Sequence, residues 1–165
     1  MVKNKNILLL VTILFFLSQP KIYSQEQSSM MDKSRLKNKL TEIQYYVTQE
    51  KGTEKPFTGE YWNFFEKGTY YCICCGAELF ESDSKFASSC GWPSFFDTKF
   101  EKNIKFQTDT SFGMVRTEVQ CKQCNAHLGH IFDDGPKPTG KRFCINSAAI
   151  KFIPNDKRKD GTQNH

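Results

Sequence analysis

The sequence predicts a small, all-β dominated antiparallel fold with one N-terminal amphipathic helix and a structural zinc staple. Short segments rich in β-branched and aromatic residues, bounded by Gly, Pro, Asn and Asp, indicate strands and turns. An apolar stripe before them indicates the helix, and two Cys-x-x-Cys motifs indicate the metal. The 165 residues leave room for one domain after any targeting segment, and 15 Phe supply ring area for its core.

The first 24 residues are typical of a secretory signal peptide. Lys3 and Lys5 precede an apolar run over 7–18, and Ser24, a small residue, stands before a polar segment. The 12 residues of this run make about 18 Å of helix, which is too short for a hydrocarbon core of about 30 Å. We expect cleavage, export to the periplasm or the exterior, and no stable membrane insertion afterwards. An uncleaved membrane anchor is the alternative.

The charge balance favours no acidic partner. The formal charge is +5, but three of the 23 basic residues lie in or beside the predicted signal, leaving 20 against 18 acidic residues, or +2. No basic run interleaved with aromatic residues, of the kind that binds single-stranded nucleic acid, is present. We therefore expect no nucleic-acid partner. We also expect a monomer.

A flexible lead-in (25–34) is expected to precede the helix. The spacings of 4, 3 and 4 between its apolar residues fit one face of a helix, bounded by Gly52 and Pro56. An aromatic cluster over 61–65 suggests one helical turn closed by Gly68. The apolar residues of the predicted helix are Leu36, Leu40, Ile43 and Val47.

Strands are predicted at 70–73, 113–119 and 145–153. A Gly- and Pro-rich loop over 135–140 leads into residues 141–145. The expected domain covers 35–154, and a polar tail follows over 155–165.

Four of the seven cysteines have the spacing of a zinc site. Cys72 and Cys75 form one Cys-x-x-Cys motif, and Cys121 and Cys124 form another; Gly or Asn follows each. The 45 residues between the motifs exceed the roughly 15–20 of a compact zinc ribbon, so one ion would staple distant parts of the fold. Disulfides, and with them a purely structural exterior domain, are the alternative.

Three cysteines remain: Cys74, Cys90 and Cys144. His127 and His130 follow the second motif and are three residues apart. Cysteine with histidine suits acyl transfer, and the histidine pair beside Asp133-Asp134 suits a second metal. A second cysteine next to a Gly-Trp-Pro turn is better explained as a resolving thiol, so we interpret the chain as a two-cysteine redox enzyme. Cys74 has no predicted role beyond buried packing.

At these residues the chain resembles the B-type methionine sulfoxide reductases. The resemblance covers about 120 residues, from near Tyr45 to Phe152, and includes both Cys-x-x-Cys motifs. Ser89 stands where many members have glycine. The matching motifs are SSCGWPSF at 88–95, HLGHIFDDGP at 127–136 and RFCINSA at 142–148.

The resemblance implies two antiparallel sheets with zinc far from the reactive thiol, and reduction of peptide-bound methionine (R)-sulfoxide. It implies that Cys144 is the nucleophile, that Cys90 resolves its sulfenic acid as a Cys90–Cys144 disulfide, and that a thioredoxin-like dithiol recycles the enzyme. The other implied site residues are His130 as acid, His127, Asn146 and Asp134 around the oxygen, Arg142 beside the thiolate, and Trp92 and Phe143 against the substrate.

Overall fold

The computed structural model describes residues 34–156. Residues 34–39 are helical, and the folded domain begins at Leu40. The predicted signal over 1–24, the predicted lead-in except for residue 34, and most of the polar tail lie outside the described residues. Within the described range, no helix is long and apolar enough to cross a membrane.

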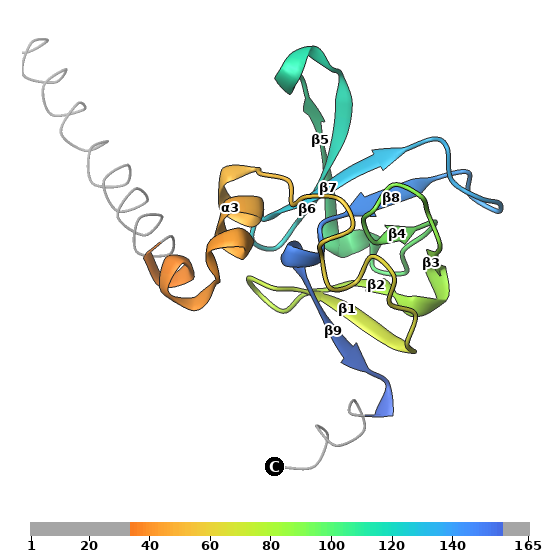
Figure 1. Ribbon diagram of the computed structural model, residues 1–165, viewed down its shortest axis with the longest axis horizontal. Coiled ribbons are helices and arrows are strands. Elements are labelled where there is room, and N and C mark those ends of the chain that lie inside the picture. Colours follow the sequence, from red (N-terminus) through yellow and green to blue (C-terminus); the bar gives the residue numbers. More distant parts are fainter. Residues whose placement is uncertain (1–33, 157–165) are drawn as a thin grey trace, which may run out of the picture. The chain divides into compact units, whose positions relative to one another are not determined.

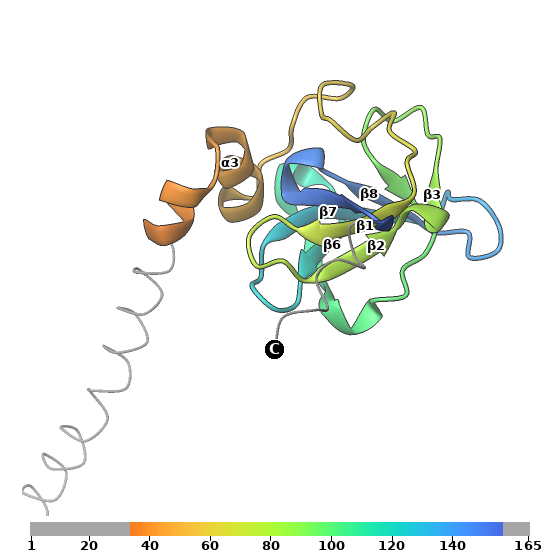
Figure 2. The same cartoon turned by 90° about the horizontal axis from the view of Figure 1, so that it is seen from below.

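Two antiparallel sheets form the domain, as predicted (Figures 1 and 2). The smaller sheet has the order β2–β1–β9, and the larger has the order β3–β4–β8–β7–β6–β5. The strands are β1 (Gly68–Cys72), β2 (Glu78–Glu81), β3 (Lys85–Phe86), β4 (Ser94–Phe95), β5 (Ile104–Asp109), β6 (Arg116–Cys121), β7 (His127–Phe132), β8 (Arg142–Ile145) and β9 (Ile150–Pro154).

The single predicted helix is in fact interrupted. Helix α3 (Glu42–Glu50) begins only at Thr41, whose hydroxyl accepts from the backbone of Gln44 while the Gln44 side chain accepts from the backbone of Thr41. This reciprocal capping box starts a new helix within the expected stripe. Val47 of that stripe is fully buried, but Ile43 is exposed.

Two other expected elements differ from the structure. The predicted strand over 145–153 is not continuous: Ile145 ends β8, the 3-10 turn η4 (Ser147–Ala149) follows, and β9 begins at Ile150 in the other sheet. The predicted helical turn over 61–65 is absent: residues 61–63 form a non-helical turn and residues 64–65 are irregular. Gly68, which was expected to close the helical turn, instead begins β1. The predicted strand at 70–73 corresponds to β1. The predicted strand at 113–119 overlaps β6 only in its later part, because β6 begins at Arg116.

Aromatic side chains join the two sheets. Phe80 of β2 stacks on Phe95 of β4 at 4.5 Å between ring centroids, and Tyr70 of β1 meets the same ring at 5.1 Å. All three are fully buried. Large buried rings dominate the energy of a small core, so this cluster fixes one face of the six-stranded sheet against the smaller sheet. The opposite face of the larger sheet is left to carry polar groups.

Candidate functional site

The four predicted zinc ligands meet at the ends of two strands. Cys72 ends β1 and Cys121 ends β6, and a tight turn after each brings back its partner, Cys75 or Cys124. The four sulfur atoms all lie within 4.8 Å of one another, and two of the pairs are 3.6 Å apart. A tetrahedral site with Zn–S bonds of about 2.3 Å has edges of about 3.8 Å, so the cluster fits one zinc ion.

The metal site links the two sheets, because β1 belongs to the smaller sheet and β6 to the larger. The sulfur separations exceed the disulfide bond length of about 2.05 Å, and none of the seven cysteines, all of which lie in the described range, forms a disulfide. Cys74 lies beside the cluster, is buried, and accepts from the side chain of Gln49 at 3.5 Å.

Cys144 lies on β8, between β4 and β7. Its cross-strand partners are Ser94 and His130, so these side chains share one face of the sheet. Cys90 precedes β4, and its Sγ lies 3.7 Å from Sγ of Cys144. The hydroxyl of Ser94 lies 3.4 Å from the same Cys90 sulfur. The two cysteines predicted to form a redox pair are therefore brought together.

The contact between Cys90 Sγ and Cys144 Sγ is a hydrogen bond in which the two sulfurs share one proton. The bond from Cys144 lowers the pKa of Cys90 to about 4, against the effect of burial. The same bond, together with burial, raises the pKa of Cys144, while Arg142 acts to lower it. Arg142 therefore lowers the pKa of Cys144, as expected, but Cys90 raises it by more while both cysteines are reduced.

A β-bulge places both histidines on this face. In a regular strand, His127 and His130 would point to opposite sides, since side chains alternate. The register of β6 with β7 pairs Val119 with Gly129 and the next residue with His127, which leaves Leu128 as the extra residue. The bulge turns His127 to the side of His130, and their ring centroids are 5.4 Å apart.

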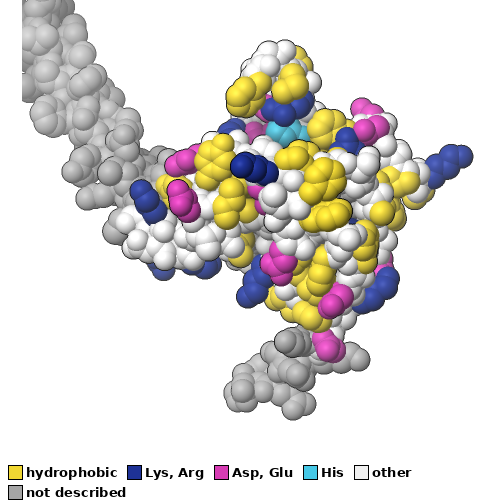
Figure 3. Space-filling view, in the orientation of Figure 1, with side chains coloured by type: hydrophobic (Ala, Val, Ile, Leu, Met, Phe, Trp, Pro, Cys, Tyr) yellow, Lys and Arg dark blue, Asp and Glu magenta, His cyan; other side chains and the backbone are white. Residues whose placement is uncertain are grey.

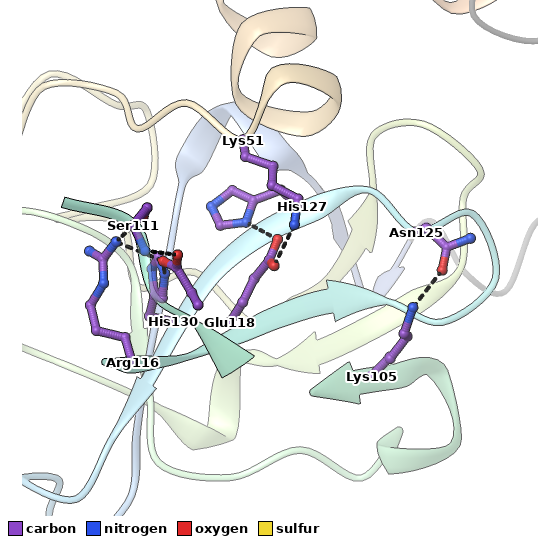
Figure 4. Close-up of polar contacts among 9 residues, drawn as sticks. Lys51, Lys105, Ser111, Arg116, Glu118, Asn125, His127 and His130 are labelled. Carbon is purple, nitrogen blue, oxygen red and sulfur yellow. Dashed lines mark hydrogen bonds and ion pairs between the residues drawn. The ribbon is translucent and has the colours of Figure 1, made fainter. Parts of the chain in front are cut away.

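His127 is oriented by a buried carboxylate. Its Nδ1 lies 2.7 Å from Glu118, which also accepts from Lys51 at 2.8 Å (Figure 4). Burial opposes ionisation of Glu118, but its hydrogen bonds, from Lys51 first, lower its pKa below the ordinary value. Burial lowers the pKa of His127. A neutral His127 therefore donates from Nδ1, and its buried Nε2 has no hydrogen-bond partner among the described residues.

His130 is held by a second carboxylate, Asp109 at the end of β5. Its Nε2 lies 2.7 Å from Oδ2 of Asp109, which also accepts from Arg116 at 2.7 Å, beside Ser111 (Figure 4). Hydrogen bonds from Ser111 and His130 lower the pKa of Asp109 well below its ordinary range. The carboxylate is therefore ionised, so Nε2 of His130 donates to it and only Nδ1 is left for another ligand.

His130 and Arg116 line a pocket of about 100 Å³ that reaches Cys144, whereas His127 is not among its lining residues. Gly129 lets the strands approach closely here, because a Cβ on it would lie 2.0 Å from the carbonyl oxygen of Cys144. The pocket is lined by Thr53, Trp92, Arg116, Gly129, His130, Phe132, Cys144 and Asn146.

Two of the lining residues are fixed by the buried segment around Glu54. Trp92 donates from its ring to the carbonyl of Glu54 at 3.1 Å, and the Asn146 side chain accepts from the Glu54 backbone at 3.1 Å. The Glu54 carboxylate in turn accepts from the backbones of Ser147 and Ala148, at 2.6 and 2.9 Å. This segment therefore ties the wall formed by Trp92 to the end of β8.

Phe143, expected against the substrate, does not line the pocket. Side chains alternate along β8, so Phe143 points away from Cys144 into the core, where it packs 5.4 Å from Phe80. Phe132 supplies the second aromatic wall instead. The alternation of a strand at 142–145 was sufficient to make this distinction from the sequence.

Asp134 pairs with Arg142 rather than standing among the lining residues. The guanidinium donates to both carboxylate oxygens at 2.8 Å and lies over the ring of Phe132, 4.5 Å from its centroid. Since Arg142 and Cys144 are two residues apart on β8, they share a face. Asp134 thus positions the cation that acts on the Cys144 thiol.

No pattern in the sequence indicated four residues that shape the site. They are Glu118 and Asp109, which hold the histidines, Arg116, and the buried Glu54. Each is an isolated acidic or basic residue whose neighbour in space is distant in the chain. The patterned spacing that identified the cysteines offers no guide to such contacts.

Comparison with known proteins gives consistent matches. The SelR domain family model matches residues 40–154. A peptide methionine sulfoxide reductase MsrB of Cellvibrio japonicus is 57% identical over 114 residues, which cover 69% of this chain and 81% of that protein. One from Acinetobacter baumannii is 53% identical over 123 residues, covering 74% and 88%.

A mammalian protein matches as well. The mitochondrial methionine-R-sulfoxide reductase B3 of Mus musculus is 54% identical over 127 residues, covering 77% of this chain. The matched region spans 50% of the mouse protein's own length.

Proposed function

The chain belongs to the MsrB family and has peptide methionine-(R)-sulfoxide reductase activity, and from this premise we propose that Cys144 is its nucleophile and Cys90 its resolving thiol. The observation that carries the proposal is the 3.7 Å separation of the two sulfurs beside a pocket that reaches Cys144. The four-cysteine cluster is the structural zinc site.

The first step begins with the shared proton. Its movement from Cys144 to Cys90 leaves a Cys144 thiolate beside Arg142, which stabilises the negative charge. The thiolate sulfur takes the oxygen of the sulfoxide, the sulfoxide sulfur gains the electron pair, and one proton is added. The products are the methionine thioether and a Cys144 sulfenic acid.

His130 supplies the proton to the departing oxygen. Its Nε2 donates to Asp109, so Nδ1 is the ring nitrogen that gives the proton. His127 remains neutral and offers Nε2 as an acceptor for a water or a protonated oxygen. Asn146 is held rigidly at the pocket, and Trp92 and Phe132 contact the methyl and methylene groups of the substrate.

The second step regenerates the enzyme. Cys90 gives up the proton that it received in the first step, and its sulfur attacks the sulfenic sulfur of Cys144. The sulfenic oxygen leaves with that proton as water, and a Cys90–Cys144 disulfide remains. A dithiol donor of the thioredoxin type then reduces this bond, returning two thiols and becoming a disulfide itself.

Substitution of each cysteine tests these roles. Cys144→Ser is expected to abolish reduction, whereas Cys90→Ser is expected to complete about one turnover per chain and then fail with a protein dithiol donor. Cys74→Ser, which changes a cysteine beside the zinc cluster, should recycle normally. Full recycling by Cys90→Ser would assign the resolving step to another thiol and contradict the proposal.

We further propose that the protein is exported and repairs oxidised proteins outside the cytoplasm. The apolar run after Lys3 and Lys5, its length and the small residue Ser24 support a cleaved signal. Cell fractionation and N-terminal sequencing of the mature protein test this, with a start near Gln25 expected. A mature protein that retains residues 1–24 would favour the membrane-anchored alternative.

A further inference from the structure

The turn between β5 and β6 carries an uncharged apolar surface. Residues 110–115, which we name the hairpin tip, contain no charged side chain. Phe112 is 89% exposed, Val115 82% and Met114 47%. Hydrophobic side chains gather at the projecting top of Figure 3, where Figure 1 places this turn. Single exposed apolar residues are common, but a contiguous group of them marks an interaction site.

The hairpin tip is held in shape from its base. The carboxylate of Asp109 accepts from the backbone of Ser111 at 2.9 Å and from Arg116 at 2.7 Å. Phe112 has φ of 55°, a left-handed conformation that is unfavourable for a bulky side chain. Because this ring is almost fully exposed, no packing within the domain offsets that cost. The conformation is explained if the ring packs against a partner.

The hairpin tip is continuous with the active-site pocket. Arg116, immediately after the tip, lines the pocket with Cys144, and Asp109, immediately before it, binds His130. Figure 3 shows a histidine directly below the projecting hydrophobic group. A polypeptide whose oxidised methionine enters the pocket therefore has its neighbouring residues close to the tip.

A second segment, next to the lining residue Trp92, also carries an exposed phenylalanine with a left-handed backbone. Phe57 is 53% exposed, and its φ of 65° is also left-handed. Its backbone donates to the carbonyl of Gly91, next to the lining residue Trp92, at 2.8 Å. Exposed phenylalanines thus flank lining residues on two separate segments.

We propose that the hairpin tip binds apolar residues that flank the oxidised methionine in an unfolded segment of a protein substrate. Methionine is among the residues most often buried in folded proteins, so its oxidised form becomes accessible mainly where an apolar segment has unfolded. The lack of charge on the tip suits such a segment. This inference rests on the proposed function and adds a substrate preference to it.

The test compares two peptides and one small substrate with dithiothreitol as reductant. Both peptides carry methionine (R)-sulfoxide, flanked by Leu and Val in one and by Ser and Gly in the other; the small substrate is the N-acetyl, C-amide amino acid. The double variant Phe112→Asn/Val115→Ser removes the exposed ring of Phe112 and the branched side chain of Val115. Asn adopts the left-handed conformation of position 112 readily. Ile43→Ser, which removes an exposed apolar residue from α3, is the matched control.

The wild type and the control should prefer the apolar peptide by roughly five- to tenfold in kcat/KM, as partial burial of such side chains gives. The double variant should lose this preference through KM and reduce the small substrate normally. A preference that survives in the double variant, or an equal loss on the small substrate, would overturn the proposal. So would a loss that appears only when a protein dithiol donor replaces dithiothreitol, which would assign the tip to that donor. Failure of the wild type on the small substrate would instead contradict the proposed function.

Discussion

Oδ2 of Asp109 lies 2.7 Å from Nε2 of His130, although 21 residues separate them in the chain. The carboxylate stays ionised because hydrogen bonds from Ser111 and His130 lower its pKa. One ring nitrogen of His130 is thereby fixed as a donor to Asp109, and the other faces the chemistry. This pairing makes Asp109 a positioning residue for the proposed acid.

Asp109→Asn is expected to lower kcat about 100-fold, the scale of general acid catalysis. The amide retains a polar contact but can also donate to the ring, so it no longer fixes Nε2 as the donor and leaves the orientation of His130 undetermined. The loss should therefore fall on kcat, while KM changes little. Both constants, measured with a small sulfoxide and dithiothreitol, check this.

The control for that variant is Asp83→Asn, which breaks the exposed ion pair between Asp83 and Lys67. It removes one carboxylate from the domain without touching the pocket, and it should leave kcat unchanged. If Asp109→Asn lowers the melting temperature but leaves kcat unchanged, Asp109 is only a structural residue.

Removal of zinc should lower the melting temperature sharply, by at least about 10 °C, because metal binding is part of the folding free energy. The cluster joins β1 to β6, so its loss should loosen the contact between the sheets. Thermal melts before and after chelation, with restoration by added Zn²⁺ as the control, measure the effect. An unchanged melt would rule out a structural role for the metal.

Stability should fall as the pH is lowered below about 6.5, the ordinary pKa of histidine. Burial lowers the pKa of His127 in the folded state, so the unfolded chain binds that proton first. The contribution is present above pH 6.5 and is lost as the pH falls toward the folded pKa. Glu118, whose pKa is also lowered, adds a similar loss below its ordinary value of 4.5.

Urea unfolding of the zinc-loaded protein at pH 7.5 and pH 5.5 measures this slope. His127→Gln should reduce the difference between the two pH values, since the group that titrates is gone. An equal slope in the wild type and the variant would assign the pH dependence to other groups.

Glu54→Gln should cost about 1–3 kcal/mol of stability, since it leaves one buried backbone N–H facing an amide donor. The Glu54 carboxylate accepts from Ser147 and Ala148, and its backbone holds Trp92 and Asn146. A rise in KM should accompany the loss of stability because the pocket wall moves. Glu101→Gln, at an exposed site, should change neither quantity.

The sequence predicted the β-dominated fold and the zinc cluster because both depend on repeated local patterns. Cys-x-x-Cys spacing encodes its own turn, and the β-rich segment at 70–73 encodes β1. It did not predict the break before α3. The apolar stripe continues through this point, but the capping box formed by Thr41 and Gln44 starts a new helix there. The short strands β3 and β4 were missed because two residues carry no periodicity.

For the site, the resemblance supplied the residues and the fold supplied their relationships. Spacing alone could not show that a bulge at Leu128 brings His127 beside His130. Nor could it show that Glu118 and Asp109 hold the two rings, because each contact crosses strands. The prediction that Phe143 contacts the substrate was wrong, because side chains alternate along β8 and Phe143 points to the face opposite Cys144.

The position of β8 between β4 and β7 has a consequence for durability. Backbone hydrogen bonds of an inner strand are released only by the larger openings of a domain, whereas edges and loops open at little cost. Cys144 therefore sits where amide exchange should be slowest, and Cys90, in a loop, where it should be faster. Partial damage or fraying at the periphery would leave the reacting sulfur in place, which suits a protein that must keep working among oxidised and unfolding neighbours.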